Sequence, residues 1–263
     1  MKVAVISLGS TLGKTCFCAT LGGVYSRTQG RPCAIFSTSD AIDNIEIVNI
    51  PVKNDDLINP YVAKTQIEQS DKGNEATFNY GLQAGDEKVF IFNIMGCAMD
   101  LKEKEEFLIA GINKVPAALT LVEINGEITS ELNQTVLKEC DMCLCLVDAS
   151  AKTFRTLEGF IKLLPYRLQD RVAYVISRYD DKVISDKELS KKSSIPMRVM
   201  LKFPYSPVVA RLAHNGNLDR IAYEIVVGNA EVTQFRVKMQ EIMEFIFNTP
   251  TRKIVREISR WYK

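Results

Sequence analysis

The chain has 263 residues, which is enough for one large α/β domain, whereas two separate domains would each be small. Its composition, 46% hydrophobic and 25% charged with 14 Gly and 9 Pro, excludes a disordered or collagen-like chain. The 33 Lys and Arg almost balance the 32 Asp and Glu, so the formal net charge is +1 and a nucleic-acid partner is not expected.

Strand and helix patterns alternate from the first residues of the chain. This order predicts βα units, and hence an α/β fold with a mostly parallel twisted sheet and helices on both faces. The first strand is expected over residues 3–8, followed by a turn over 9–15, a helix over 16–28 and a second strand over 33–36. Later apolar runs predict strands at 89–94, 118–123, 142–147, 172–176 and 197–203, with helices at 101–112 and 153–164.

The region from about residue 51 to 86 differs from the rest because it is polar and shows no clear apolar face. We expect it to be a peripheral excursion from a single domain that covers residues 1–250. No run of 18 apolar residues is present, and the N-terminal apolar run is too short for a secretory signal, so a cytoplasmic protein is expected.

The seven cysteines are odd in number and lie mostly in apolar runs, which favours reduced core thiols over a disulfide framework. Cys140 and Cys143 have the spacing of a metal or redox pair, but no second Cys or His pair stands nearby to complete a zinc tetrahedron. His214 is the only histidine and cannot anchor a metal site by itself.

The turn after the first predicted strand has the features of a phosphate-binding loop. It reads Gly9, Ser10, Thr11, Leu12, Gly13, Lys14, Thr15, and Cys16 then opens the predicted helix. In such a loop the backbone N–H groups surround the phosphates at a helix N-terminus, the lysine reaches the β and γ oxygens, and the Thr15 hydroxyl binds Mg²⁺. The pattern is incomplete, since Leu8 stands where its first glycine is expected, and a chance Gly-Lys-Thr remains the alternative.

Together with later landmarks, this loop resembles that of the ParA/MinD family of deviant Walker ATPases. Ser37-Thr38-Ser39 stands where the family has Asp-x-Asp, and Glu123 and Gly126 stand at the family's Walker B acid and switch glycine. The resemblance implies a P-loop NTPase fold that binds ATP or ADP with Mg²⁺, the metal being held by Thr15 and Glu123. It also implies a homodimer and a protein partner belonging to a larger assembly.

The positions that depart from the family pattern are those with roles in ATP hydrolysis. Gly9 replaces the signature lysine that reaches across an ATP-bound dimer, and serines replace both aspartates after the second strand, one of which helps to place the attacking water. A hydroxyl lacks the charge for that task, and Asp40 would substitute only if its loop shifted. Lys14 is retained as the catalytic and binding lysine, so nucleotide binding is expected to outlast rapid hydrolysis. A member that binds no nucleotide is the alternative.

Base recognition is expected near the ends of two later strands. Arg178 could stack its guanidinium plane on adenine, with Pro204 and Tyr205 on the other side. All three could equally be ordinary loop residues.

Residues 251–263 predict a basic amphipathic helix. Five basic residues and one acidic residue surround one apolar face, which is formed by Ile254, Val255, Ile258, Trp261 and Tyr262. Such a helix can lie on an anionic membrane surface, here the inner face of the cell membrane, or can pack on the domain or on another subunit.

The combined expectation is an ATP-binding regulatory or positioning protein with weak or absent hydrolysis. The resemblance implies a role in placing a division, pilus or secretion apparatus, or a replicon. Two alternatives remain: a P-loop biosynthetic enzyme that transfers a phosphoryl or adenylate group, with residues 51–86 forming the second substrate pocket, and a nucleotide-free scaffold with a vestigial loop.

Overall fold

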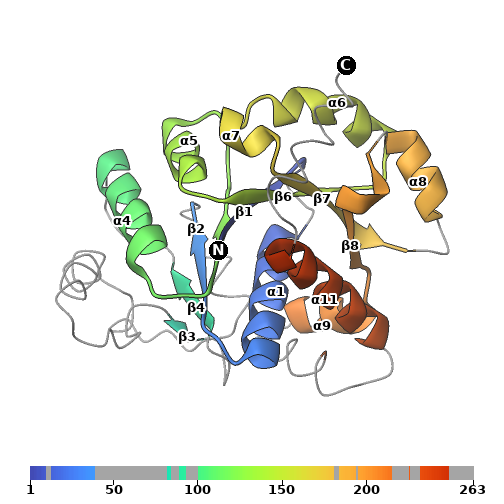
Figure 1. The fold of residues 1–263 in the computed structure, drawn as a ribbon, viewed down its shortest axis with the longest axis horizontal. Coiled ribbons are helices and arrows are strands. Elements are labelled where there is room, and N and C mark those ends of the chain that lie inside the picture. Colours follow the sequence, from blue (N-terminus) through green and yellow to red (C-terminus); the bar gives the residue numbers. More distant parts are fainter. Residues whose placement is uncertain are drawn as a thin grey trace.

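A single eight-stranded sheet runs through the described part of the computed structural model, which comprises residues 1–9, 13–38, 82–83, 89–92, 100–180, 184–193, 195–214, 225 and 232–248 (Figure 1). Its strand order is β3-β4-β2-β5-β1-β6-β7-β8, and every neighbouring pair is parallel except β3 with β4. The strands are β1 (Lys2–Ser7), β2 (Cys33–Ser37), β3 (Leu82–Gln83), β4 (Val89–Phe92), β5 (Leu119–Glu123), β6 (Met142–Val147), β7 (Val172–Tyr179) and β8 (Met200–Pro204).

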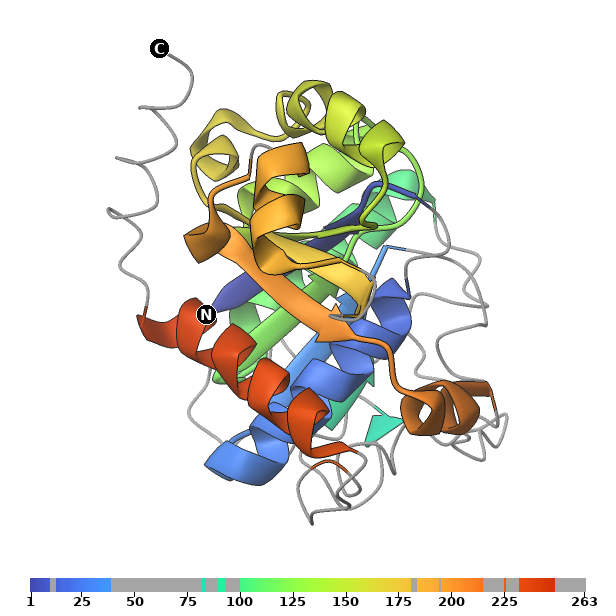
Figure 2. The same ribbon diagram turned by 90° about the vertical axis from the view of Figure 1, so that its right-hand side faces the viewer.

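Helices cover both faces of this sheet (Figures 1 and 2). One face packs against α1 (Lys14–Gln29), α9 (Pro207–His214) and α11 (Thr233–Asn248). The other face packs against α4 (Leu101–Lys114), α5 (Glu131–Lys138), α6 (Ala151–Ile161), α7 (Tyr166–Gln169) and α8 (Asp186–Ser193). The predicted α/β architecture with helices on both faces is confirmed.

The two faces hold separate apolar clusters, and successive residues of a strand alternate between them. In β1, Val3 and Val5 belong to the cluster under α1 and α11, whereas Ala4 and Ile6 belong to the cluster under α4 to α8. Because both faces are buried, each strand is apolar throughout, and this explains why continuous apolar runs predicted the strands well.

One close approach between the layers depends on a glycine. Gly111 in α4 faces Phe36 in β2, and a Cβ atom added at Gly111 would lie 2.4 Å from the Phe36 ring. That distance is shorter than real Cβ contacts, so a residue with a side chain would push α4 or the ring away.

Most predicted elements are found within a few residues of their expected ends, but three corrections are needed. The expected strand over 197–203 begins as a 3₁₀ helix, Met197–Val199, and turns into β8 only at Met200. The helix expected over 153–164 begins at Ala151, because the Ser150 side chain accepts the Thr153 N–H as its N-cap, and ends at Ile161. Helices α5, α7, α8, α9 and α11 and the short strand β3 were not predicted.

Three other expectations stay untested, because part or all of the residues that they concern lie outside the described ranges. They concern the extent of the domain over 1–250, the polar region 51–86, of which only the short antiparallel strand β3 is described, and the helix over 251–263. Among the described residues, no helix combines the length and apolar character needed to cross a membrane.

Candidate functional site

The predicted loop residues lie at the carboxyl edge of the sheet, where β1 leads into α1. Gly9 and Gly13 both have positive φ, 145° and 75°, and Gly13 is the N-cap of α1 without any side-chain cap. The first turn of α1 contains no acidic residue, so its N-terminal N–H groups and helix dipole favour an anion. Ser10, Thr11 and Leu12 lie outside the described residues.

Lys14 is held over the start of this loop by the end of β1. Its Nζ donates to Ser7 Oγ at 3.0 Å, and the Ser7 hydroxyl in turn donates to the Gly9 carbonyl at 2.6 Å. The ammonium group is therefore kept next to the helix N-terminus, where it adds a full positive charge to the partial charge of the helix dipole.

Thr15, in the first turn of α1 after β1, meets Glu123 at the end of β5, the parallel neighbour of β1. Val5 pairs with Glu123, and Thr15 Oγ1 donates to Glu123 Oε1 at 2.7 Å. Glu123 is 2% exposed, so this carboxylate is buried beside the loop.

This donor set fits a magnesium ion that is also held by a nucleotide. A hydroxyl and a carboxylate are hard oxygen ligands, and Mg²⁺ commonly takes one or two protein ligands while phosphates and water complete its shell. Within the described ranges, no three His, Cys, Asp or Glu side chains gather as a metal cage, so the phosphates would have to supply the other ligands.

The end of β2 carries a neutral hydrogen-bond network where the resemblance would place aspartates. Ser37 is 1% exposed, and its Oγ accepts from Asn125 Nδ2 at 3.1 Å. Thr38 donates its N–H to the Glu123 carbonyl at 3.0 Å and accepts the Asn125 N–H at 2.9 Å. Sequence reasoning missed this network, because its partners are 85 or more residues apart in the chain. The signal that could have revealed it is that β2 and β5 end at the same edge of the sheet as parallel neighbours. Ser39 and Asp40 lie outside the described residues.

The loop that follows β5 is fixed from α5. Gly126 has φ of 73° and is exposed, with open space where a side chain would stand. Asn133 Nδ2 donates to the carbonyls of Asn125 and Glu127, both at 2.8 Å, and so holds the two residues that flank Gly126. The buried Oδ1 of Asn133 finds no hydrogen-bond partner within the described part of the chain.

The three residues predicted to contact the base lie at the same edge of the sheet, two and three strands from β1. Arg178 is exposed and has φ of 54° at a bulge between β7 and β8. The Tyr205 N–H donates to the Tyr179 carbonyl at 3.1 Å, which holds the two strand ends together. Pro204 is buried as the last residue of β8, and Tyr205 is exposed.

The described cysteines are all free, and all but Cys16 are fully buried. Burial raises the pKa of Cys16 to about 11 and that of Cys140 to about 12. Burial also raises the pKa of Cys143 well above its ordinary value. Among the described residues these thiols belong to no group of three His, Cys, Asp or Glu side chains that could hold a metal, and they pack within the apolar clusters of the core.

Comparison with known proteins finds likeness at the level of the fold. No protein-family model and no curated protein matches the chain. A ParA family ATPase from Chlorobium tepidum is 12% identical with a TM-score of 0.65, and the match covers 90% of this chain and 96% of that one. The septum site-determining protein MinD from Pyrococcus horikoshii, complexed with Mg-ADP, is 12% identical with a TM-score of 0.62, covering 94% and 97%.

A putative plasmid partition protein from Borrelia burgdorferi, bound to AMPPNP, is 10% identical with a TM-score of 0.62, covering 92% of this chain and 98% of that one. Because these matches span nearly the whole of each chain, the fold is ParA/MinD-like. The expectation for the fold, drawn from the order of the sequence landmarks, is thereby confirmed.

Proposed function

We propose that the protein is an ATP-binding regulatory or positioning protein of the ParA/MinD type, with weak or absent hydrolysis. The observation that carries the proposal is the grouping of Lys14, Thr15 and Glu123 at the N-terminus of α1. Two proteins of the same fold hold nucleotide, Mg-ADP in one and AMPPNP in the other.

Each residue of the group has a distinct role in binding. The N–H groups at the start of α1 donate to the phosphates, and Lys14 exchanges Ser7 Oγ for phosphate oxygens. Thr15 Oγ1 and Glu123 would hold Mg²⁺, and the ion would neutralise phosphate charge. Their existing hydrogen bond keeps both oxygens in place before the ion arrives, which lowers the ordering cost of binding.

The proposal of slow hydrolysis rests on the end of β2. Attack by water on a γ-phosphate needs a group that orients the water, usually a carboxylate or an amide placed next to it. Ser37 is buried, neutral and already bonded to Asn125. The bound nucleotide is therefore expected to remain unhydrolysed for a long time. This suits a protein whose role depends on whether nucleotide is bound and not on the rate of ATP turnover.

A homodimer and a protein partner from a larger assembly are part of the same proposal. Gly9 stands where the signature lysine of the family would reach the partner subunit's phosphates, so any dimer of this chain must form without that charge. Size-exclusion chromatography with light scattering, run with ATP and with no nucleotide, tests whether the mass doubles on binding.

Isothermal titration with ATP and ADP, each with and without Mg²⁺, tests the central proposal. Binding that tightens when Mg²⁺ is present supports the assigned roles of Thr15 and Glu123. If neither nucleotide binds the folded wild-type protein under any of these conditions, the protein is a scaffold with a vestigial loop and the proposal fails.

A further inference from the structure

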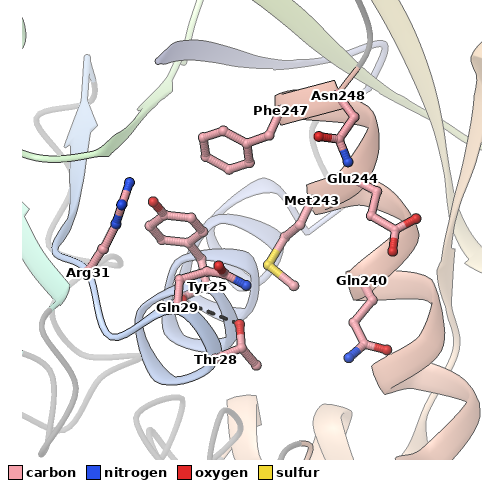
Figure 3. Close-up of a pocket in the computed structure, with 9 residues that line it drawn as sticks. All are labelled: Tyr25, Thr28, Gln29, Arg31, Gln240, Met243, Glu244, Phe247 and Asn248. Carbon is pink, nitrogen blue, oxygen red and sulfur yellow. Dashed lines mark hydrogen bonds between the residues drawn. The ribbon is translucent and has the colours of Figure 1, made fainter.

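A pocket lies at the opposite end of α1 from the candidate nucleotide site (Figure 3). It has a volume of about 380 Å³ and is formed where the C-terminal ends of α1 and α11 meet. It is lined from α1 by Tyr25, Thr28 and Gln29, and from α11 by Gln240, Met243, Glu244, Phe247 and Asn248. The nine lining residues include neither Lys14 nor Thr15, so the pocket is separate from the candidate nucleotide site.

The electrostatic character of the α11 side of the pocket favours a basic occupant. Two helix C-termini converge on it, and each carries the negative end of a helix dipole. The last turn of α1 contains Arg27, but the last turn of α11 contains no basic residue, and Glu244 adds a carboxylate on that side. Arg31 is the one basic lining residue and lies on the opposite side of Tyr25 from Glu244 (Figure 3).

The pocket also offers apolar and aromatic surface next to the carboxylate. The rings of Tyr25 and Phe247 stack at 5.3 Å with an interplanar angle of 16°. Phe247 remains 43% exposed, and further back along α11 Val237 is 44% exposed. A basic amphipathic segment matches such a surface, because its apolar face covers the rings while its charges meet Glu244.

The chain itself contains such a segment directly after the pocket. Fifteen residues follow Asn248, and residues 251–263 combine one apolar face with five basic residues and one acidic residue. As a helix, thirteen residues extend about 20 Å, and α11 from Asn248 back to Val237 extends about 17 Å. The segment therefore has the length to cover the exposed face of α11 as well as the charge and the apolar stripe to do so.

We propose that residues 251–263 dock back onto their own chain at this pocket, with the apolar face against Phe247 and Met243 and the basic side chains against Glu244. This inference goes beyond the proposed function and does not depend on nucleotide binding. It gives the C-terminal segment a protein site in the absence of any membrane.

Trp261 allows a direct test, because it is the only tryptophan in the chain. In the full-length protein, acrylamide quenching of Trp261 fluorescence measures how well the segment is shielded. We expect shielding in the wild type and weaker shielding in Glu244→Lys, where the docking equilibrium constant should fall by about 1.5- to fivefold, the size typical of an exposed ion pair. Raising the salt concentration should expose Trp261 in the same way, since the attraction is screened.

Two controls separate docking from a general effect of charge or folding. Glu158→Lys makes the same charge change on α6, which covers the other face of the sheet, and should leave quenching unchanged. Adding Arg252→Glu and Lys253→Glu to Glu244→Lys should restore shielding. A circular dichroism melt of each variant confirms that the quenching measurements compare folded proteins.

Three outcomes would overturn the proposal. Trp261 could be as accessible in the wild type as in Glu244→Lys, or its shielding could disappear on dilution, which would identify a second copy as the occupant. Shielding that arises only on addition of phosphatidylglycerol vesicles would make the segment a membrane contact instead.

Discussion

Replacement of Lys14 by alanine tests the role of the loop most directly, and the structure sets the size of the expected effect. Hydrogen bonds to charged groups are worth about 1.5–3 kcal/mol; a lysine bound to phosphate, where both partners are charged, lies at the upper end of this range, while its present bond to Ser7 Oγ has a neutral acceptor and lies at the lower end. Binding exchanges the second for the first. Lys14→Ala should therefore weaken ATP binding by about 1–2 kcal/mol, which corresponds to roughly 5- to 30-fold in Kd.

Isothermal titration of wild type and Lys14→Ala with Mg-ATP measures this difference, and Ser7→Ala is the informative control. Ser7→Ala removes the partner that Lys14 must leave, so it should leave the affinity unchanged or raise it slightly. Equal Kd values for wild type and Lys14→Ala would refute the reasoning. So would a Ser7→Ala variant that binds as weakly as Lys14→Ala, because the loop's shape and not the charge would then control binding.

Three further predictions concern the same site and the core. The rate of ATP hydrolysis should lie far below that of ordinary enzymes, which is on the order of 1–10 per second, and it should rise in Ser39→Asp. If the wild-type protein hydrolyses ATP at that ordinary rate, the argument from missing carboxylates is wrong. Glu123→Gln should keep the fold but lose the gain in ATP affinity that Mg²⁺ gives, as titration with and without the ion would show. Burial raises the pKa of Cys16 to about 11 and of Cys140 to about 12, so both stay protonated in the folded protein at pH values where the unfolded thiols ionise. The free energy of unfolding should consequently fall as pH rises above 9, the ordinary thiol pKa. Urea unfolding curves of the wild type and of Cys140→Ala, recorded at pH 7.5 and at pH 10, measure this fall. An equal pH dependence in the two proteins would contradict the contribution of Cys140.

The strands could be predicted from sequence because nearly every one is buried on both faces. A buried strand such as β6 is a continuous apolar run bounded by polar residues, and its predicted ends match the structure. β8 was misplaced at its start because Met197 and Val199 flank Arg198 in the alternating pattern of a strand, yet Pro196 precedes a 3₁₀ turn there.

The missed helices differ in how much signal they carried. In α11 the buried residues Phe235, Met239, Ile242, Met243 and Ile246 repeat with helical spacing, so the pattern was present and was overlooked. In α8 only Leu189 belongs to the core, and a mostly polar eight-residue segment offers no periodicity to detect.

At the candidate site, residues that belong to local motifs could be predicted, whereas contacts between distant segments could not. Lys14 and Thr15 follow from the loop pattern, whereas Glu123 was assigned by the resemblance, as the acid at the end of a predicted strand. The Asn133 bonds across Gly126 could not be anticipated, because they depend on how α5 approaches the end of β5. The proposed roles of Arg178, Pro204 and Tyr205 at the base stay predictions.

The close contact between Gly111 and Phe36 offers a route to a conditional mutant. A Gly111→Ala chain must separate α4 from β2 or turn the Phe36 ring, and Phe36 is followed directly by Ser37 and Thr38, which bond to Asn125 and Glu123. The added methyl would strain the packing without removing any group of the site, so we expect a protein that folds at low temperature and loses nucleotide binding on mild warming. In a cell, such an allele would let the protein be switched off by a temperature shift, and its growth phenotype would then report the process the protein serves.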